Sequence, residues 1–246
     1  MNRSRILIIL FLVHIWSAAV ALAGPAGGPA TFAQAKRVLA REIYHDHRLT
    51  VYCGAEYDER GQVSLPEGFI TPGYAARAAR IEWEHLVPAE NFGRNFAEWR
   101  EGHEKCVDTR GRAYRGRRCA GRVNQEYRAM ESDMNNLAPA IGAVNAMRRN
   151  YDFAPLPGRP NTFGLCPMKI YQRRAEPPPT ARGLIARAYL HMSLTYPGYS
   201  LGADQQELML AWNRQYPPDE WECTRARRIA ARQDRPNVFT ISACEE

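Results

Sequence analysis

Two spacings of apolar residues divide the sequence into helices and strands. Apolar side chains recur at helical spacing over 32–43, which predicts a helix near the start of the chain. The same spacing predicts helices towards the end, over 180–196, 203–216 and 219–233. The middle of the chain is punctuated by glycine and proline and contains the clearest strand pattern. We therefore expect an α+β fold with a helix-rich C-terminal part.

The strand pattern lies at 81–86, where IEWEHL alternates apolar and polar residues and Pro88 stops the strand soon afterwards. In a flat strand Glu84 and His85 point to opposite faces, so both can enter one cleft only if the chain bends between them. A carboxylate suits Mg²⁺ or Ca²⁺, and an imidazole can accept a proton from water. On its own, the motif is better explained by a solvated acidic face beside a hydrogen-bonded structural histidine than by a metal site with a base.

Further short elements are predicted between these regions. They are a strand at 49–54, a helical turn at 89–100, a helix at 124–133 and a strand at 166–172. Pro139 stands where a helix can begin, and IGAVNAMRRN continues from it as a helix. Asn145 lies in the middle of that helix, where asparagine is a weak helix former, and its amide oxygen is an acceptable cation ligand. An exposed or locally bonded asparagine is the equal alternative.

The first residues have the layout of a cleaved export signal. Residues 1–23 contain Arg3 and Arg5, then the apolar run ILIILFLVHIW, and end in ALA. This run is too short for a good membrane anchor, and a flexible spacer rich in glycine, proline and alanine follows at 24–31. We expect residues 32–246 to form one exported domain, periplasmic or extracellular, that is a monomer without a membrane anchor or an obligate protein partner.

Six cysteines lie after the export signal: Cys53, Cys106, Cys119, Cys166, Cys223 and Cys244. An even number in an exported chain predicts three structural disulfides. Cys106 with Cys119 and Cys223 with Cys244 are the near-neighbour pairs, although sequence does not give the connectivity. The polar, arginine-rich segment between the first pair is therefore expected to be a stapled loop, which can present arginines to a phosphate at low entropic cost.

The charge of the chain is basic and comes mainly from arginine. The formal charge of +7 falls to +5 when the two arginines of the export signal are removed. Arginines cluster at 110–122, 148–149, 173–174 and 225–235. Such clusters are typical of surfaces that contact nucleic-acid phosphates, and we expect Arg115, Arg118, Arg148 and Arg149 to bind substrate. A solvated face that aids solubility is the alternative for any single cluster.

Several motifs together resemble the bacterial endonuclease I family. They are YCG at 52–54, EWEHLVPAENFG at 82–93, MESDMNNLAPAIGAVN at 130–145 and YPPDEWEC at 216–223. The resemblance extends from about Phe32 to Cys244, nearly the whole chain after the export signal. Members are exported nucleases without sequence preference. The resemblance therefore implies hydrolysis of phosphodiester bonds in DNA, and also in RNA, with 5′-phosphate products.

The resemblance also implies an active site. The family has a ββα-metal site, also called a His-Me finger, in a single mixed α/β domain. Carried over to this sequence, Glu84 and Asn145 would hold one Mg²⁺ ion, for which Ca²⁺ or Mn²⁺ could substitute, and His85 would be the general base. An arginine before Cys119 would contact the scissile phosphate. We assign this role to Arg117 in GRRC, with Arg115 and Arg118 as alternatives.

Three features depart from the family pattern. The loop between Cys106 and Cys119 is longer than in members that have GGRKNC. Ala55 and Pro72 stand where some members have cysteines, so one family disulfide is expected to be absent, which leaves six cysteines for three bridges. Asn135 stands where relatives often have histidine.

Two other classes of function fit part of the sequence. The first is an exported nucleic-acid-binding protein without catalysis, against which the intact set of Glu84, His85 and Asn145 argues. The second is a secreted zinc hydrolase that uses His45, His47 and His85, but these histidines lack any spacing like HExxH.

Overall fold

A two-stranded antiparallel sheet with a helix directly after it forms the centre of the protein. The computed structural model describes residues 27–245, so the predicted export signal and the first three residues of the predicted spacer lie outside the described residues. Strand β3 (Ile81–His85) pairs with β4 (Leu137–Ile141), and α7 (Gly142–Arg148) follows β4 without a connecting loop. The order strand, strand, helix therefore brings the EWEH motif beside Asn145.

The close packing of α7 on β3 explains the glycine at the start of this helix. A Cβ atom on Gly142 would lie 2.5 Å from the carbonyl oxygen of Arg77 and 3.0 Å from a carboxylate oxygen of Glu82. A residue with a side chain would therefore push α7 away from β3 and from its glutamates.

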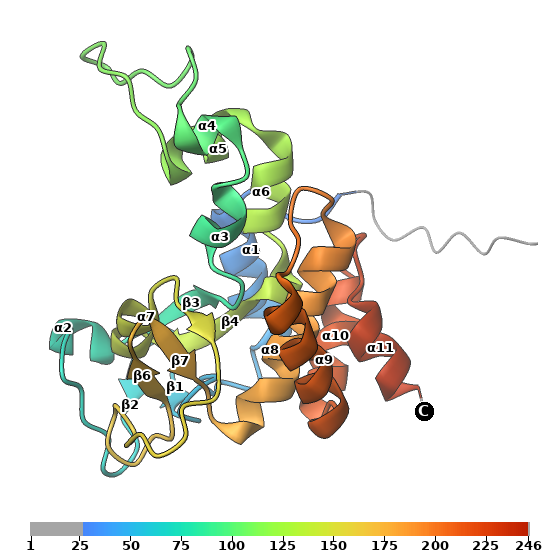
Figure 1. Ribbon diagram of the computed structural model, residues 1–246. Helices are drawn as coiled ribbons and strands as arrows, with labels where there is room; N and C mark the ends of the chain where they lie inside the picture. The colour runs from blue at the N-terminus through green and yellow to red at the C-terminus, as the bar shows by residue number, and fades with distance from the viewer. Residues whose placement is uncertain (1–26, 246) are drawn as a thin grey trace, which may run out of the picture.

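The C-terminal helices pack as a block against β4, as Figure 1 shows on the right of the molecule. They are α8 (Pro179–Thr195), α9 (Ala203–Gln215), α10 (Glu220–Ala230) and α11 (Val238–Cys244). The buried Arg225 of α10 donates hydrogen bonds to the carbonyl oxygens of Met134 and Leu137, at 2.8 and 2.9 Å. These bonds fix the start of β4 to the helical block.

Short strands and turns form the other side of the molecule, at the lower left of Figure 1. They are β1 (Glu56–Tyr57), β2 (Val63–Ser64), α2 (Ala75–Ala78), β5 (Asp152–Phe153), β6 (Lys169–Tyr171) and β7 (Arg174–Glu176). The strands pair as β1 with β2 and in the order β5, β7, β6.

The remaining helices lie above β3, and an irregular arm extends from them at the top of Figure 1. They are α1 (Phe32–Val38), which continues as a π-helical turn η1 (Leu39–Ile43), then α3 (Ala89–Gly93), α4 (Ala97–Arg100), α5 (Arg117–Val123), α6 (Gln125–Glu131) and the 3₁₀ turn η2 (Met134–Asn136). We define the arm as residues 101–116. Within residues 27–245, no helix is long and apolar enough to cross a membrane.

Three disulfides join the six cysteines, as predicted. Cys106 bonds to Cys119 and Cys223 bonds to Cys244, and the third bridge connects Cys53 with Cys166 across 113 positions of sequence. The first bridge closes the base of the arm, and the third ties the turn after η1 to the small sheets. The stapled loop expected between Cys106 and Cys119 is therefore confirmed, apart from the helix α5 at its end.

Most predicted elements are present, and the structure corrects two of them. The predicted strand at 49–54 is a turn, closed by a hydrogen bond from the backbone N–H of Gly54 to the carbonyl oxygen of Thr50. Pro139 does not begin a helix but lies inside β4 opposite Trp83. Proline is tolerated there because, within residues 27–245, β4 pairs with no strand except β3. On its other edge the carbonyl oxygen of Pro139 accepts from the backbone N–H of Val51, and no donor is needed from the proline nitrogen. The helix begins at Gly142 instead.

Candidate active site

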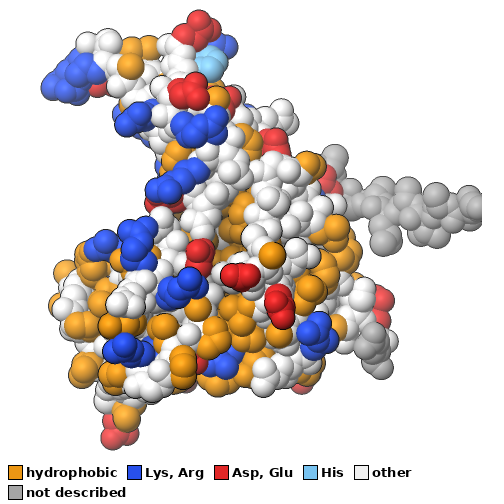
Figure 2. Space-filling view, in the orientation of Figure 1, with side chains coloured by type: hydrophobic (Ala, Val, Ile, Leu, Met, Phe, Trp, Pro, Cys, Tyr) orange, Lys and Arg blue, Asp and Glu red, His pale blue; other side chains and the backbone are white. Residues whose placement is uncertain are grey.

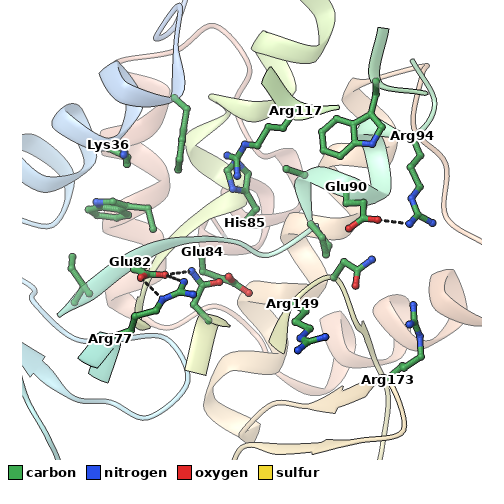
Figure 3. A pocket seen from close by; sticks show the side chains of 18 residues that line it. Lys36, Arg77, Glu82, Glu84, His85, Glu90, Arg94, Arg117, Arg149 and Arg173 are labelled. Carbon is green, nitrogen blue, oxygen red and sulfur yellow. Dashed lines mark hydrogen bonds and ion pairs between the residues drawn. The ribbon is translucent and has the colours of Figure 1, made fainter. Parts of the chain in front are cut away.

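A cleft of about 890 Å³ runs along the free edge of β3. The residues predicted for catalysis and metal binding, Glu84, His85, Arg117 and Asn145, all line it. His85 and Glu84 lie on opposite sides of β3 in Figure 3. The bend predicted between them is not needed, because the ladder with β4 continues to His85, and side chains from both faces reach a cleft at the strand edge.

The carboxylate of Glu84 is buried and held from behind. One oxygen, Oε1, accepts hydrogen bonds from the hydroxyl of Tyr52 at 2.9 Å and from the guanidinium of Arg148 at 3.1 Å. Burial raises the pKa of Glu84 to about 7, although Arg148 and Tyr52 act in the opposite direction. Among the described residues Oε2 has no hydrogen-bond donor, and it is the oxygen left for a ligand in the cleft.

Asn145 projects from α7 towards the same part of the cleft. Its amide nitrogen donates to Oε2 of Glu82 at 2.8 Å, which fixes the orientation of the amide. Glu82 is in turn held by a pair of hydrogen bonds from Arg77. Because the nitrogen of Asn145 is engaged, its oxygen Oδ1 is the atom available to a cation.

The donor set fits a hard divalent cation. A carboxylate and an amide oxygen are the ligand types that Mg²⁺ and Ca²⁺ prefer, and Mg²⁺ is commonly held by one or two protein ligands with water and phosphate oxygens. Residues 27–245 contain no group of three or more histidine, cysteine, aspartate and glutamate side chains arranged to hold a metal. One carboxylate oxygen and one amide oxygen, from Glu84 and Asn145, suit a cation whose other ligands are water or phosphate oxygens.

His85 is held in one tautomer by a backbone carbonyl. Its Nε2 lies 2.9 Å from the carbonyl oxygen of Glu131, which can only accept, so Nε2 carries the proton and Nδ1 is unprotonated. Burial, followed by the positive charge of Arg117, lowers the pKa of His85 to about 3. The ring also packs against Phe32, with centroids 4.7 Å apart. The imidazole is therefore rigid and neutral at physiological pH.

Arg117 stands beside His85 at the start of α5. Its Nε donates to Oε1 of Glu131 at 2.6 Å, and its guanidinium lies over the ring of Phe32. About half of the side chain, 47%, is exposed to solvent. Glu131 thus orients two residues of the cleft, His85 through its backbone and Arg117 through its carboxylate.

Comparison with known proteins identifies the family. The family model for Endonuclease I matches residues 31–244. The chain belongs to the endonuclease I family. It is therefore a nuclease, as the resemblance of its motifs predicted.

Three relatives in the endonuclease I family show how far the likeness extends. An extracellular deoxyribonuclease of Aeromonas hydrophila is 42% identical over 222 residues, which cover 87% of this chain and 91% of the relative. A periplasmic deoxyribonuclease of the same species is also 42% identical, over 87% of each chain. Endonuclease-1 of Buchnera aphidicola subsp. Baizongia pistaciae is 34% identical over 87% of this chain and 84% of the relative. The names of the two Aeromonas relatives agree with the predicted export.

The four arginines predicted to bind substrate lie in different surroundings in the structure. Arg149 is exposed and lines the cleft. Arg115 donates to the carbonyl oxygen of Arg100 at the base of the arm, and Arg118 stacks on Tyr114; neither lines the cleft. Among the three arginines considered for the scissile phosphate, Arg117 alone lines it.

The structure corrects the prediction that Arg148 binds substrate. Its side chain is completely buried, and it donates to Glu84, to the carbonyl oxygens of His85 and Leu86, and to the hydroxyl of Tyr189. A guanidinium so enclosed cannot reach a substrate phosphate. It instead fixes the end of β3 and the carboxylate of Glu84.

Sequence reasoning missed the positioning roles of four residues, namely Tyr52, Glu82, Glu131 and Arg148. Glu82 had a usable signal, because it shares a strand face with Glu84. Arg148 had one too, since it stands four positions after the buried Val144 on the same helix face. No sequence signal pointed to the role of Glu131 beside His85, because this contact uses a backbone carbonyl.

The histidines considered for a zinc site are dispersed. His47 stacks on Trp221, with ring centroids 4.0 Å apart, and His45 lies near Asp46 on the surface. Neither lines the cleft that contains His85.

Proposed function

We propose that this protein is an exported, sequence-nonspecific endonuclease that hydrolyses DNA with one Mg²⁺ ion and His85 as the general base. The observation that carries the proposal is the convergence of Glu84, His85, Arg117 and Asn145 on one cleft beside a strand–strand–helix unit. The deoxyribonuclease names of the relatives support DNA as the substrate.

His85 activates the nucleophile. A water molecule near Nδ1 attacks the phosphorus and gives its proton to this nitrogen, while Nε2 keeps its proton and donates it in a hydrogen bond to the carbonyl oxygen of Glu131. The bond between phosphorus and the 3′ oxygen breaks. The products are a 5′-phosphate and, once the leaving oxygen takes a proton from water, a 3′-hydroxyl; His85 then releases its extra proton to solvent.

Arg117 and the cation site offset the charge of the phosphate. Arg117 binds a nonbridging oxygen, and its ion pair with Glu131 keeps the guanidinium beside His85. Glu84 Oε2 and Asn145 Oδ1 would hold the Mg²⁺ ion, which when bound stabilises negative charge on the phosphate and on the leaving oxygen. Tyr52 and Arg148 keep Glu84 in place for this role.

Contacts to phosphate rather than to bases account for the lack of sequence preference. The charged residues on the rim of the cleft are mostly basic, namely Lys36, Arg77, Arg94, Arg117, Arg149 and Arg173. Figure 2 shows lysine and arginine side chains along the concave left edge of the molecule, from the arm to the lower body. Such contacts read no base edge, so RNA is expected to be cleaved as well and activity should fall steeply with salt.

The test is nicking of supercoiled plasmid by the purified mature chain, with Mg²⁺ or with EDTA. We expect cleavage with Mg²⁺ only, and a loss of about 10²-fold or more in the His85→Ala variant. His103→Ala is the matched control, because His103 lies on the arm outside the cleft. Nicking by His85→Ala at the wild-type rate would refute the assignment of the base. Retarded plasmid without nicking by the wild type would favour the noncatalytic binding protein.

The cation ligands need a separate measurement. In Asn145→Ala the Mg²⁺ concentration for half-maximal rate should rise about tenfold or more. Asn150 lines the same cleft, and Asn150→Ala should leave this concentration unchanged. Equal Mg²⁺ curves for the two variants would argue against Asn145 as a ligand. Restoration of EDTA-treated enzyme by Zn²⁺ but not by Mg²⁺ would favour a zinc hydrolase.

A further inference from the structure

A second groove of about 890 Å³ lies beside the catalytic cleft, on the other side of α1. Its walls are the outer face of α1 and η1 on one side and the turn between β1 and β2 on the other. We call it the α1 groove and define it by six of its lining residues: Lys36, Arg37, Arg41, Arg60, Arg80 and Trp83. The proposed reaction leaves it without a role.

The α1 groove carries a positive charge excess. Six lysine and arginine side chains line it, against the two acidic side chains Asp58 and Glu59. Both acids are engaged within the protein. Asp58 accepts backbone hydrogen bonds from Arg60 and Gln62, and Glu59 forms an ion pair with Arg48 at 3.3 Å. Of the six cations, Arg48 is paired with Glu59, and Arg80 lies 3.9 Å from Glu82. The charge excess of the groove therefore comes from the other four.

The arrangement of charge on α1 is unfavourable for the helix itself. Arg37 and Arg41 stand four positions apart and are both exposed, and like charges at this spacing destabilise a helix. Among the contacts within residues 27–245, neither guanidinium has an ion pair or a hydrogen bond. The nearby acid Glu42 pairs with Arg232 instead, at 2.6 Å. These arginines thus have no evident role in stabilising the fold.

The α1 groove is continuous with the catalytic cleft. Lys36, Ile81 and Trp83 line both. Trp83 is half-buried, with its ring held edge-on by Tyr44 at a centroid distance of 5.5 Å. A rigid aromatic surface between two basic walls is an arrangement on which nucleic-acid bases stack while the backbone follows the charge.

We propose that the α1 groove binds the phosphate backbone of the same nucleic-acid chain on one side of the scissile bond. This inference rests on the proposed function, because it takes the ligand of the cleft to be a nucleic acid. Arg37 and Arg41 contact flanking phosphates, and the strand passes Trp83 between the cleft and the groove. The groove thereby favours long substrates over short ones.

The experiment measures binding in EDTA, so that no turnover occurs, by fluorescence anisotropy of a labelled duplex more than two helical turns long. In Arg37→Ala/Arg41→Ala the slope of log Kd against log salt should fall by about two, and Kd at low salt should rise about tenfold or more. Binding of a tetranucleotide, which occupies only the cleft, should not change. Arg37→Lys/Arg41→Lys should restore the slope, because the charges are retained.

The matched control is Arg214→Ala/Arg227→Ala. Both residues are exposed helical arginines, on α9 and α10, and line neither the cleft nor the groove. If the control lowers the slope as much as the α1 variant, or if the α1 variant binds the duplex like wild type, the groove has no specific part in binding. An equal loss with the tetranucleotide would likewise overturn the proposal, since the effect would then lie in the cleft.

The two proposals fail separately. If the wild-type protein nicks plasmid but Arg37→Ala/Arg41→Ala keeps the full salt slope, only the proposal for the α1 groove is refuted. Protein that does not nick plasmid, but whose salt slope falls in the α1 variant, would refute catalysis alone. A melting temperature equal to wild type in both double variants is expected, because all four side chains are exposed.

Discussion

The buried ion pair of Arg148 and Glu84 is expected to control the stability of the strand–strand–helix unit. The two side chains are 1% and 3% exposed, and their charged atoms lie 3.1 Å apart. Arg148 also donates to the carbonyl oxygens of His85 and Leu86, at 3.0 and 2.6 Å, and its guanidinium lies 4.4 Å from the ring centroid of Phe153. Arg148→Met keeps most of the volume and removes every donor.

The size of the effect follows from burial. Removing one partner of a buried ion pair costs about 3–5 kcal/mol, because the remaining carboxyl group must either keep an unpaired buried charge or take up a proton. For a chain of this size about 1 kcal/mol corresponds to 2–4 °C in melting temperature, so a fall of roughly 6–20 °C is expected. The neighbouring Arg149 is exposed, and Arg149→Met should change stability by less than about 1 kcal/mol.

Thermal unfolding followed by circular dichroism in nonreducing buffer measures both variants. Glu84→Gln/Arg148→Met should be more stable than Arg148→Met alone, since the double variant buries no unpaired charge. A loss below about 1 kcal/mol in Arg148→Met would show that the pair behaves like an exposed one. A double variant that loses the sum of the two single losses would show that the residues do not interact.

Three further predictions concern other parts of the molecule. Burial acts to raise the pKa of Asp133, but the nearby His191 and the hydrogen bonds to this carboxylate lower it to about 2. Its contribution to the free energy of unfolding, about 2 kcal/mol, is therefore present above about pH 4 and should be lost as the pH falls through 2. Asp133→Asn should abolish that part of the pH profile of urea unfolding. Arg117→Ala should reduce plasmid nicking about 10²-fold, whereas Arg118→Ala should stay within a fewfold of wild type. Cys106→Ser/Cys119→Ser should lower the unfolding free energy by about 3 kcal/mol.

The elements with a strong period were predictable from sequence. The strand at 81–86, the first helix and the three long C-terminal helices are where the pattern placed them, within a few residues. The turn at 49–54 was not, because its β-branched and aromatic residues are typical of a strand, while local hydrogen bonds and the bridge from Cys53 to Cys166 determine its shape. The strand β4 was missed because all five of its residues are buried, so its sequence LAPAI shows no alternation.

Composition also could not distinguish the two neighbouring arginines at the C-terminal end of α7. Charge alone makes Arg148 and Arg149 equivalent, and both were predicted to contact substrate. Position separates them, because Arg148 ends the buried face of the helix and Arg149 has a positive φ of 55° that turns the chain outwards. A charged residue on an apolar helix face is thus better interpreted as the partner of a buried acid, here Glu84, than as surface.

The free edge of β3 explains how one short strand can supply two kinds of chemistry. Alternation places Glu82 and Glu84 on one face and His85 on the other, which in a wider sheet would separate the carboxylates from the imidazole by a layer of backbone. In the part of the chain that the structure describes, β4 is the one strand paired with β3, so the cleft opens along the other edge of β3 and is lined from both faces. Each face then has its own support: Tyr52 and Arg148 hold Glu84, whereas Glu131 holds His85. Because Tyr52 bonds to Glu84 and Glu131 bonds to His85, loss of the Tyr52 hydroxyl should alter cation binding without changing the tautomer of His85.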